Sequence, residues 1–138
     1  MVERDVVMAK VAALDTCLAR IADVRGRSAT LRPIDAEELV ILNLQRATQA
    51  TIDLAAHVVA SESLGLPADL ADTFTLIEKH GTIEAALATR LRKMVGFRNI
   101  AVHQYQALDP AIVEAIVSKH LDDLRTFANR IVDAFGLG

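Results

Sequence analysis

Apolar residues recur along this chain at alternating steps of three and four positions, which is the spacing of one face of an α-helix. The first segment shows the pattern at Val7, Val11, Leu14, Leu18 and Ile21. No segment shows the strict alternation that is typical of a half-buried β-strand. The pattern therefore predicts five helical segments, which span residues 2–24, 35–64, 69–80, 82 to the region of 97–105, and 109–135.

Short polar signals mark the expected helix boundaries. Asp35, with Glu38 three places later, forms a variant capping box, and Thr82 is a further N-cap candidate. Asp109 precedes Pro110, which places a cap before a proline at the first helical position. The sequence thus predicts an all-α fold, an antiparallel helical bundle of four long helices plus one short helix.

The second segment is apolar around much of its circumference. Helices with so wide an apolar surface are buried on more than one side. We expect this helix to pack against its own bundle and against a second subunit. The apolar positions are Leu39, Val40, Ile41, Leu42, Leu44, Ile52, Leu54, Ala55, Ala56, Val58 and Val59.

Composition supports packed helices in one domain over residues 1–138. Hydrophobic residues make up 52% of the chain and aromatic residues only 4%, so the core has to consist of Leu, Ile, Val and Ala. The single cysteine, Cys17, excludes an intrachain disulfide and fits a reducing compartment. No apolar run is long enough for a signal peptide or a membrane span. We therefore expect a cytoplasmic protein with no membrane contact.

Charge is distributed unevenly along the chain. The net charge is −3, yet the stretch 85–108 contains four basic residues and no acidic residue. Such a local cationic patch on an acidic body attracts anions such as RNA phosphates. The basic residues are Arg90, Arg92, Lys93 and Arg98. We expect the first three of these to bind RNA.

The same region contains the polar cluster FRNIAVHQY, from Phe97 to Tyr105. On a helix, Asn99 and His103 fall nearly on one line, and Arg98 starts about 140° away with a side chain long enough to reach the same groove. Gly96 costs about 1 kcal/mol in a helix interior relative to alanine, so its lack of a side chain would admit a substrate or a partner helix. Tyr105 would share the stripe of Arg98 if the helix continued that far.

These residue types suit cleavage of RNA. Histidine transfers protons near neutral pH, and arginine holds phosphate oxygens with two donors. His103 would act as the acid or base while the neighbouring 2′-hydroxyl attacks phosphorus, and Arg98 would stabilise the transition state without a metal or cofactor. Because such a reaction uses both an acid and a base, a twofold axis near the fourth helix would bring two copies of the pair into one cleft.

Structural explanations of the same residues remain open. An arginine and a histidine five places apart on a helix are often surface residues, and Asn99 and Gln104 could simply end the helix. Asp53 and His57 are a weak metal-binding candidate, better explained as an intrahelical contact or a packing histidine. Tyr105 could pack its ring at the helix end.

The string RNIAVHQY resembles the signature of the HEPN superfamily, and the longer string RLRKMVGFRNIAVHQYQALD is similar to the HepT toxin branch of that superfamily. In that branch a tyrosine follows the histidine by two places. The similarity extends through LQRATQATIDLAAHVVASESLGLP and LDDLRTFANRIV, and so covers most of the chain.

The resemblance implies a HEPN-like helical fold, a homodimer, and a metal-independent endoribonuclease that acts as a toxin on RNA such as tRNA or mRNA. Arg98 and His103 match the catalytic arginine and histidine, and Asn99 matches their polar neighbour. Tyr105 matches the tyrosine that a MntA-like nucleotidyltransferase antitoxin silences by adding AMP. The alternative is a catalytically idle helical protein that only binds a nucleotidyltransferase partner. A small-ligand-binding bundle has less support, because the sequence has no glycine-rich loop.

Overall fold

The structure, a computed structural model, describes all 138 residues of the chain. It contains six α-helices, two short 3-10 turns and no strand, so the prediction of an all-α fold is confirmed. The elements are α1 (Arg4–Gly26), η1 (Ser28–Thr30), α2 (Pro33–Ser61), α3 (Asp72–His80), α4 (Ala85–His103), η2 (Tyr105–Ala107), α5 (Pro110–Lys119) and α6 (Leu121–Ala134).

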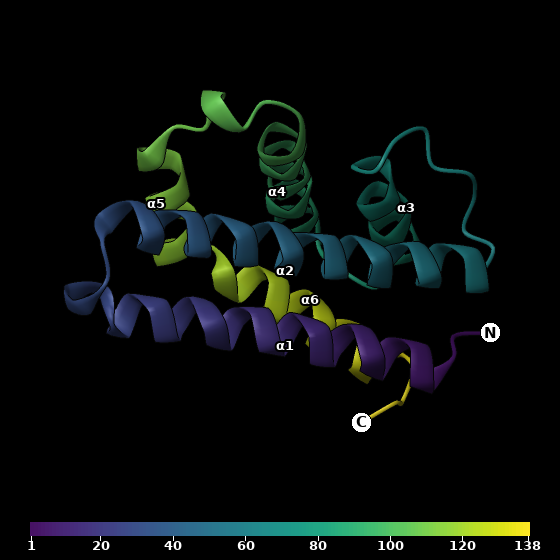
Figure 1. The fold of residues 1–138 in the computed structure, drawn as a ribbon. Helices are drawn as coiled ribbons and strands as arrows, with labels where there is room; N and C mark the ends of the chain where they lie inside the picture. The colour runs from purple at the N-terminus through teal and green to yellow at the C-terminus, as the bar shows by residue number, and fades with distance from the viewer.

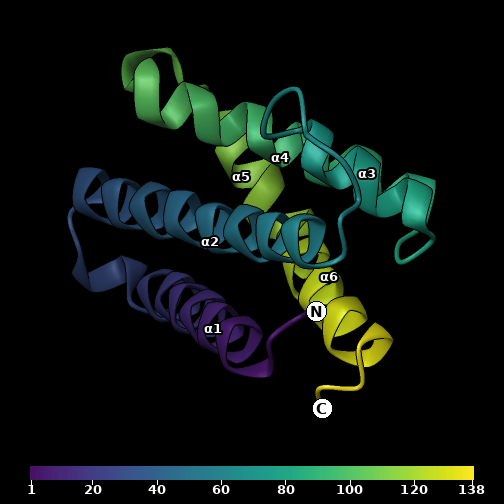
Figure 2. The same cartoon turned by 90° about the vertical axis from the view of Figure 1, so that its right-hand side faces the viewer.

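Helices α1 and α2 form an antiparallel pair that lies side by side along nearly its whole length (Figures 1 and 2). The apolar stripe predicted for the first helix faces α2 and the core. Val7, Leu14 and Ile21 are buried, while Val11 and Leu18 are partly buried and pack against the same core. The spacing of apolar residues therefore identified the correct face of α1.

Helix α2 is the central element, because it contacts α1, α3, α4 and α6. Packing within the chain thus explains most of its wide apolar surface. This confirms the expectation that α2 packs against its own bundle. Three large apolar residues near its N-terminal end stay exposed, namely Ile34, Leu39 and Leu42. The part of the prediction that assigned a second subunit to this helix is not needed to explain the buried positions.

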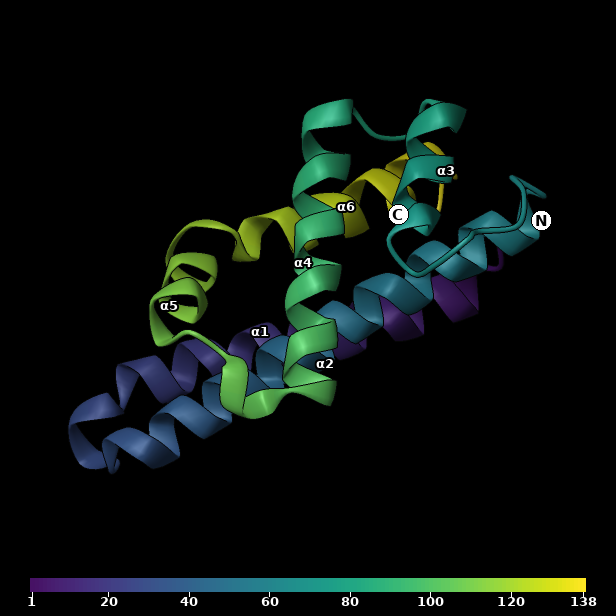
Figure 3. The same ribbon diagram turned by 90° about the horizontal axis from the view of Figure 1, so that it is seen from above.

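Helix α4 crosses over α2 rather than running along it (Figures 1 and 3). Its buried side consists of Leu87, Ala88, Leu91, Met94, Val95, Phe97 and Ala101. Most of these lie three or four positions apart, the spacing that aligns side chains on one helix face. Burial of this face against the core fixes the direction in which the C-terminal end of α4 presents the FRNIAVHQY segment.

Two predicted helix starts differ from the structure. Helix α2 begins at Pro33, and Asp35 accepts hydrogen bonds from the Arg32 guanidinium at 2.8 and 3.1 Å instead of capping backbone N–H groups. Helix α4 begins at Ala85 with Glu84 at the N-cap, not with Thr82. The Thr82 hydroxyl is instead 3.1 Å from Nδ1 of His80, which ends α3. A nearby side chain therefore took the place of the backbone partner in both cases.

The third predicted start is confirmed. Asp109 accepts a hydrogen bond of 2.9 Å from the backbone N–H of Ala111, and Pro110 occupies the first position of α5. The cap satisfies a donor that the first turn of a helix leaves free, and proline needs no donor there. This boundary sets where the chain turns after η2.

The fifth predicted helix, over residues 109–135, is wrong as a single element. The chain breaks at His120, whose φ of −124° and ψ of 0° lie outside the helical range, and it continues as α6. The charges around the break provide the reason, since Lys119 ends α5 while Asp122 and Asp123 open α6. A basic last turn and an acidic first turn each stabilise a helix end.

All buried hydrophobic side chains belong to one core of 33 residues. Within it, Phe74 of α3 and Phe127 of α6 meet edge to face with ring centroids 5.3 Å apart. The two chain termini lie at the same end of the molecule, where the Arg4 Nε donates to the backbone oxygen of Leu137 at 3.3 Å (Figure 2). None of the six helices combines the length and the apolar character that crossing a membrane requires.

Candidate active site

Arg98 lies on α4 and turns toward the middle of α2. Its Nε donates a hydrogen bond of 2.9 Å to Oε1 of Gln49, and its Nη1 donates one of 3.1 Å to Oδ1 of Asn99. The structure therefore brings together two of the three residues predicted to be catalytic. Gln49 was missed, because it is one of several polar residues of α2 and no motif in the sequence distinguishes it from the others.

A second layer of hydrogen bonds holds Gln49. Its Nε2 donates to Oδ1 of Asp53 at 2.8 Å, and Nζ of Lys10 on α1 donates to Oδ2 of the same carboxylate at 3.3 Å. Asp53 is thus occupied by partners other than His57, whose Nε2 accepts from the backbone N–H of Glu3 at 3.0 Å. The expected intrahelical contact between Asp53 and His57 is absent. His57 instead accepts a hydrogen bond from the N-cap residue of α1.

His103 is the last residue of α4 and its side chain is exposed. It makes no hydrogen bond or ion pair within the chain, whereas Arg98 and Asn99 are linked to each other. The chain therefore presents the imidazole to solvent at the end of α4 without a direct contact between it and the Arg98 guanidinium. Elsewhere, no group of three or more His, Cys, Asp or Glu side chains lies close enough together to hold a metal ion.

Tyr105 does not lie on the stripe of Arg98, because the helix ends before it. Gln104 adopts φ −141° and ψ 51°, which ends α4, and Tyr105 opens η2 with 46% of its surface exposed. Partial burial raises the pKa of the Tyr105 hydroxyl, and the carboxylates of Glu38 and Glu37 raise it further. The charges that shift the pKa of Tyr105 are thus acidic and belong to the N-terminal part of α2.

Two of the three residues predicted to bind RNA are paired with acidic side chains. Nε of Arg90 donates to Oδ1 of Asp123 at 3.0 Å, and Nη1 of Arg92 lies 3.3 Å from Oε1 of Glu78. The stretch 85–108 has no acidic residue of its own, but folding brings these two carboxylates to it. Lys93 is exposed and has no ion pair. The expectation of a patch without acidic neighbours therefore holds for Lys93 and Arg98 only.

An apolar groove of about 590 Å³ runs along α4 beside the motif, between this helix and the η2–α5 segment. Gly96 lies in its wall, and a Cβ atom at this position would meet no other atom within 4 Å. Ile100 and Ile112 line the groove and remain 41% and 55% exposed. The open space expected at Gly96 is thus present and is bordered by apolar side chains.

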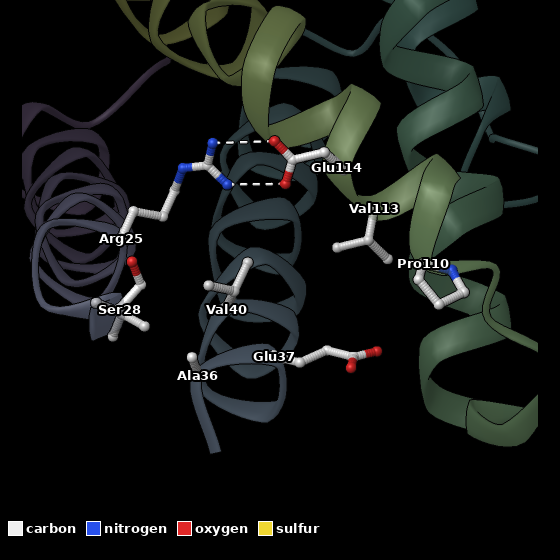
Figure 4. Close-up of a pocket in the computed structure, with 9 residues that line it drawn as sticks. Arg25, Ser28, Ala36, Glu37, Val40, Pro110, Val113 and Glu114 are labelled. Carbon is white, nitrogen blue, oxygen red and sulfur yellow. Dashed lines mark hydrogen bonds and ion pairs between the residues drawn. The ribbon is translucent and has the colours of Figure 1, made fainter. Parts of the chain in front are cut away.

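A smaller hollow of about 260 Å³ lies between α1, α2 and α5. Figure 4 shows Arg25 of α1 reaching Glu114 of α5 across it, with two hydrogen bonds of 2.9 and 3.0 Å. This contact lowers the pKa of Glu114 to about 2. Glu37, which also acts on Tyr105, forms part of the wall. The ion pair helps to fix α5, and with it the turn that carries Tyr105.

The acidic surroundings of Tyr105 generate a pH-dependent prediction. Removing two negative charges makes the phenolate easier to form, so the pKa of Tyr105 falls toward its ordinary value in the double variant Glu37→Gln/Glu38→Gln. Tyr105 is the only tyrosine and the chain has no tryptophan, so phenolate absorbance against pH reports this residue alone. The control Glu62→Gln, at the other end of α2, should titrate as the wild type does. An unchanged midpoint in the double variant would show that the carboxylates do not act on Tyr105.

Comparison with known proteins identifies the family of the chain. The family model described as Ribonuclease HepT-like matches residues 14–131. The mRNA nuclease HepT of Shewanella oneidensis is 40% identical over 128 residues, which cover 92% of this chain and 96% of that protein. A solved toxin–antitoxin structure with AMP-PNP has a TM-score of 0.86 at 39% identity and covers 92% of this chain and 97% of that one. A second structure, of the tri-AMPylated HEPN toxin of Shewanella oneidensis in complex with its MNT antitoxin, has a TM-score of 0.85 at 41% identity, with 92% and 96% covered. The resemblance seen in the motif is confirmed, and the chain belongs to the HepT-like ribonuclease family.

Proposed function

We propose that this HepT-like ribonuclease is the toxin of a toxin–antitoxin pair and cleaves RNA in the cytoplasm with Arg98, Asn99 and His103. The observation that carries the proposal is the set of hydrogen bonds made by the Arg98 guanidinium. Its guanidinium is held by the neutral oxygens of Gln49 and Asn99 and keeps its positive charge for a phosphate. The same helix end exposes His103, and the similar protein of Shewanella oneidensis is named an mRNA nuclease.

The chemistry needs only groups of the RNA and of this chain. A 2′-hydroxyl attacks the adjacent phosphorus while one His103 imidazole takes its proton, and Arg98 stabilises the added negative charge on the phosphoryl oxygens. The bond to the 5′-oxygen then breaks, and that oxygen receives a proton from a second imidazole. The products are a 2′,3′-cyclic phosphate and a free 5′-hydroxyl.

The second imidazole is the reason to place the reaction in a homodimer. One subunit has a single His103, and it is exposed at the end of α4. The apolar groove between α4 and the η2–α5 segment, with Ile100 and Ile112 exposed, is a surface that a second copy can bury, although His103 itself does not line it. A twofold axis near the C-terminal end of α4 would bring two Arg98 and His103 pairs into one cleft.

Modification of Tyr105 by a MntA-like nucleotidyltransferase antitoxin would silence this site. The hydroxyl attacks the α-phosphorus of ATP, pyrophosphate leaves, and the phenolic proton passes to a base of the partner enzyme. Tyr105 is 46% exposed and lies just beyond His103, so an attached AMP places a phosphate and a base where RNA would bind. The similar solved toxin is tri-AMPylated and bound to its MNT antitoxin, which supports the same arrangement here.

The first test of this function is cleavage of an in vitro transcribed mRNA in the presence of EDTA. Wild type should cleave it, and His103→Ala should be slower by about 10²- to 10⁴-fold because a proton-transfer group is lost. His80→Ala is the matched control, since His80 is an exposed histidine at the end of α3. Equal activity of His103→Ala and wild type would refute the assignment, and an inert wild type would favour the idle interaction protein. Metal independence would be refuted if the wild type cleaved the mRNA without EDTA but not in its presence.

The second test concerns the tyrosine. After co-expression with a MntA-like nucleotidyltransferase, mass spectrometry should find AMP on the peptide that contains Tyr105, and the modified protein should no longer cleave RNA. Tyr105→Phe removes the attacking hydroxyl, so it should gain no AMP and should keep cleaving when the nucleotidyltransferase and ATP are present. Modification of Tyr105→Phe at the wild-type level would place the acceptor elsewhere.

A further inference from the structure

We propose that Gln49 is a positioning residue for Arg98: it fixes the guanidinium through a neutral acceptor and thereby leaves the positive charge available to the RNA phosphate. This inference rests on the proposed function and goes beyond the motif, because Gln49 belongs to α2 and lies 49 residues away from Arg98 in the sequence. The contact crosses from one helix to another and is half-buried.

The orientation of the Gln49 amide is determined by its two neighbours. The Arg98 guanidinium can only donate hydrogen bonds, and a carboxylate such as Asp53 can only accept them. The amide therefore has to turn its oxygen toward Arg98 and its NH₂ group toward Asp53, as the distances of 2.9 and 2.8 Å show. Lys10, which donates to the other oxygen of Asp53, holds that carboxylate in place.

The nearby arginines show what a charged acceptor would do instead. Arg90 is paired with Asp123 and Arg92 with Glu78, so each has a local countercharge. Arg98 has none: the amide oxygens of Gln49 and Asn99 orient it without neutralising it. A phosphate that approaches Arg98 therefore competes with no carboxylate for its charge.

The two hydrogen bonds of Arg98 leave one end of its guanidinium free. Gln49 engages Nε and Asn99 engages Nη1, while Nη2 makes no hydrogen bond within the chain. The two contacts restrict rotation of the guanidinium plane. Less conformational entropy is therefore lost when the phosphate binds. The free Nη2 end is then available to a phosphoryl oxygen.

Two variants of Gln49 separate positioning from a structural role. Gln49→Glu has the same shape and strengthens the bond to Arg98, but it adds a countercharge; it should lower kcat by at least about tenfold and raise KM. Gln49→Met has similar length and no acceptor; it should lower kcat to a similar degree with little change in KM, because Arg98 keeps its charge. Gln49→Glu also turns a second carboxylate toward Asp53, so it should unfold at a lower temperature than the wild type, whereas Gln49→Met, which loses two hydrogen bonds at a half-buried position, should unfold closer to it. The values of kcat and KM are therefore measured well below both unfolding temperatures.

The control is Gln45→Glu, which adds the same charge one helical turn away at a residue that makes no hydrogen bond to Arg98. It should cleave the mRNA as the wild type does. A binding measurement provides an independent readout: in the inactive His103→Ala background, adding Gln49→Glu should weaken RNA binding and flatten its dependence on salt, because one phosphate contact is lost.

The outcomes distinguish this inference from the function on which it rests. Wild-type kcat and KM in Gln49→Glu, together with an inactive His103→Ala, would overturn the role of Gln49 and leave the ribonuclease assignment intact. Equal losses in Gln45→Glu and Gln49→Glu would also overturn it, because the effect would then be one of general charge. An inert wild type would overturn both.

Discussion

The packing of α4 across α2 is the contact on which the arrangement of the site depends. Burial of Leu91, Met94 and Val95 fixes both the position of α4 on α2 and its rotation about its own axis. With that face buried, Arg98 is directed along the surface of α2 to Gln49, while His103 extends beyond the core at the free end of the helix. The hydrophobic core therefore determines where the polar groups can act.

The same packing divides the basic residues of the region into two kinds. Arg90 and Arg92 join α4 to α6 and α3 through Asp123 and Glu78, and so contribute to holding the helices together. The Arg92–Glu78 pair is partly exposed and adds little stability by itself, whereas Asp123 is buried and Arg90 compensates its charge. Both pairs remove positive charge from the surface. Arg98 is held by amide oxygens and retains its charge. A stretch that looks uniformly cationic in sequence thus has structural arginines and one arginine suited to a phosphate.

Much of the fold and the motif could be predicted from sequence, because both depend on local spacing. The period of apolar residues located the buried face of α1, and the Asp109 cap before Pro110 identified the start of α5. The family resemblance rested on Arg98, His103 and Tyr105, whose spacing is also local. The break at His120 was missed although Lys119 and the following aspartates signal it, because the apolar period continues through the break.

What the sequence did not reveal are contacts between residues far apart in the chain. Gln49 meets Arg98, Asp123 meets Arg90, and the carboxylates of α2 act on Tyr105 only because α4 crosses α2. No pattern along the chain encodes these pairs, since their partners lie on separate helices. The missing information is therefore the angle at which helices pack, which decides which polar side chains meet.

Gln49 and Asn99 hold two nitrogens of the Arg98 guanidinium, and we propose that the rest of the group binds the RNA phosphate. The most direct measurement is the single-turnover rate of mRNA cleavage by Arg98→Lys, with RNA affinity measured in parallel. A lysine keeps the charge but has no planar fork, so RNA affinity should be largely retained while the cleavage rate falls by about 10²-fold or more. Cleavage by Arg98→Lys at the wild-type rate would contradict it.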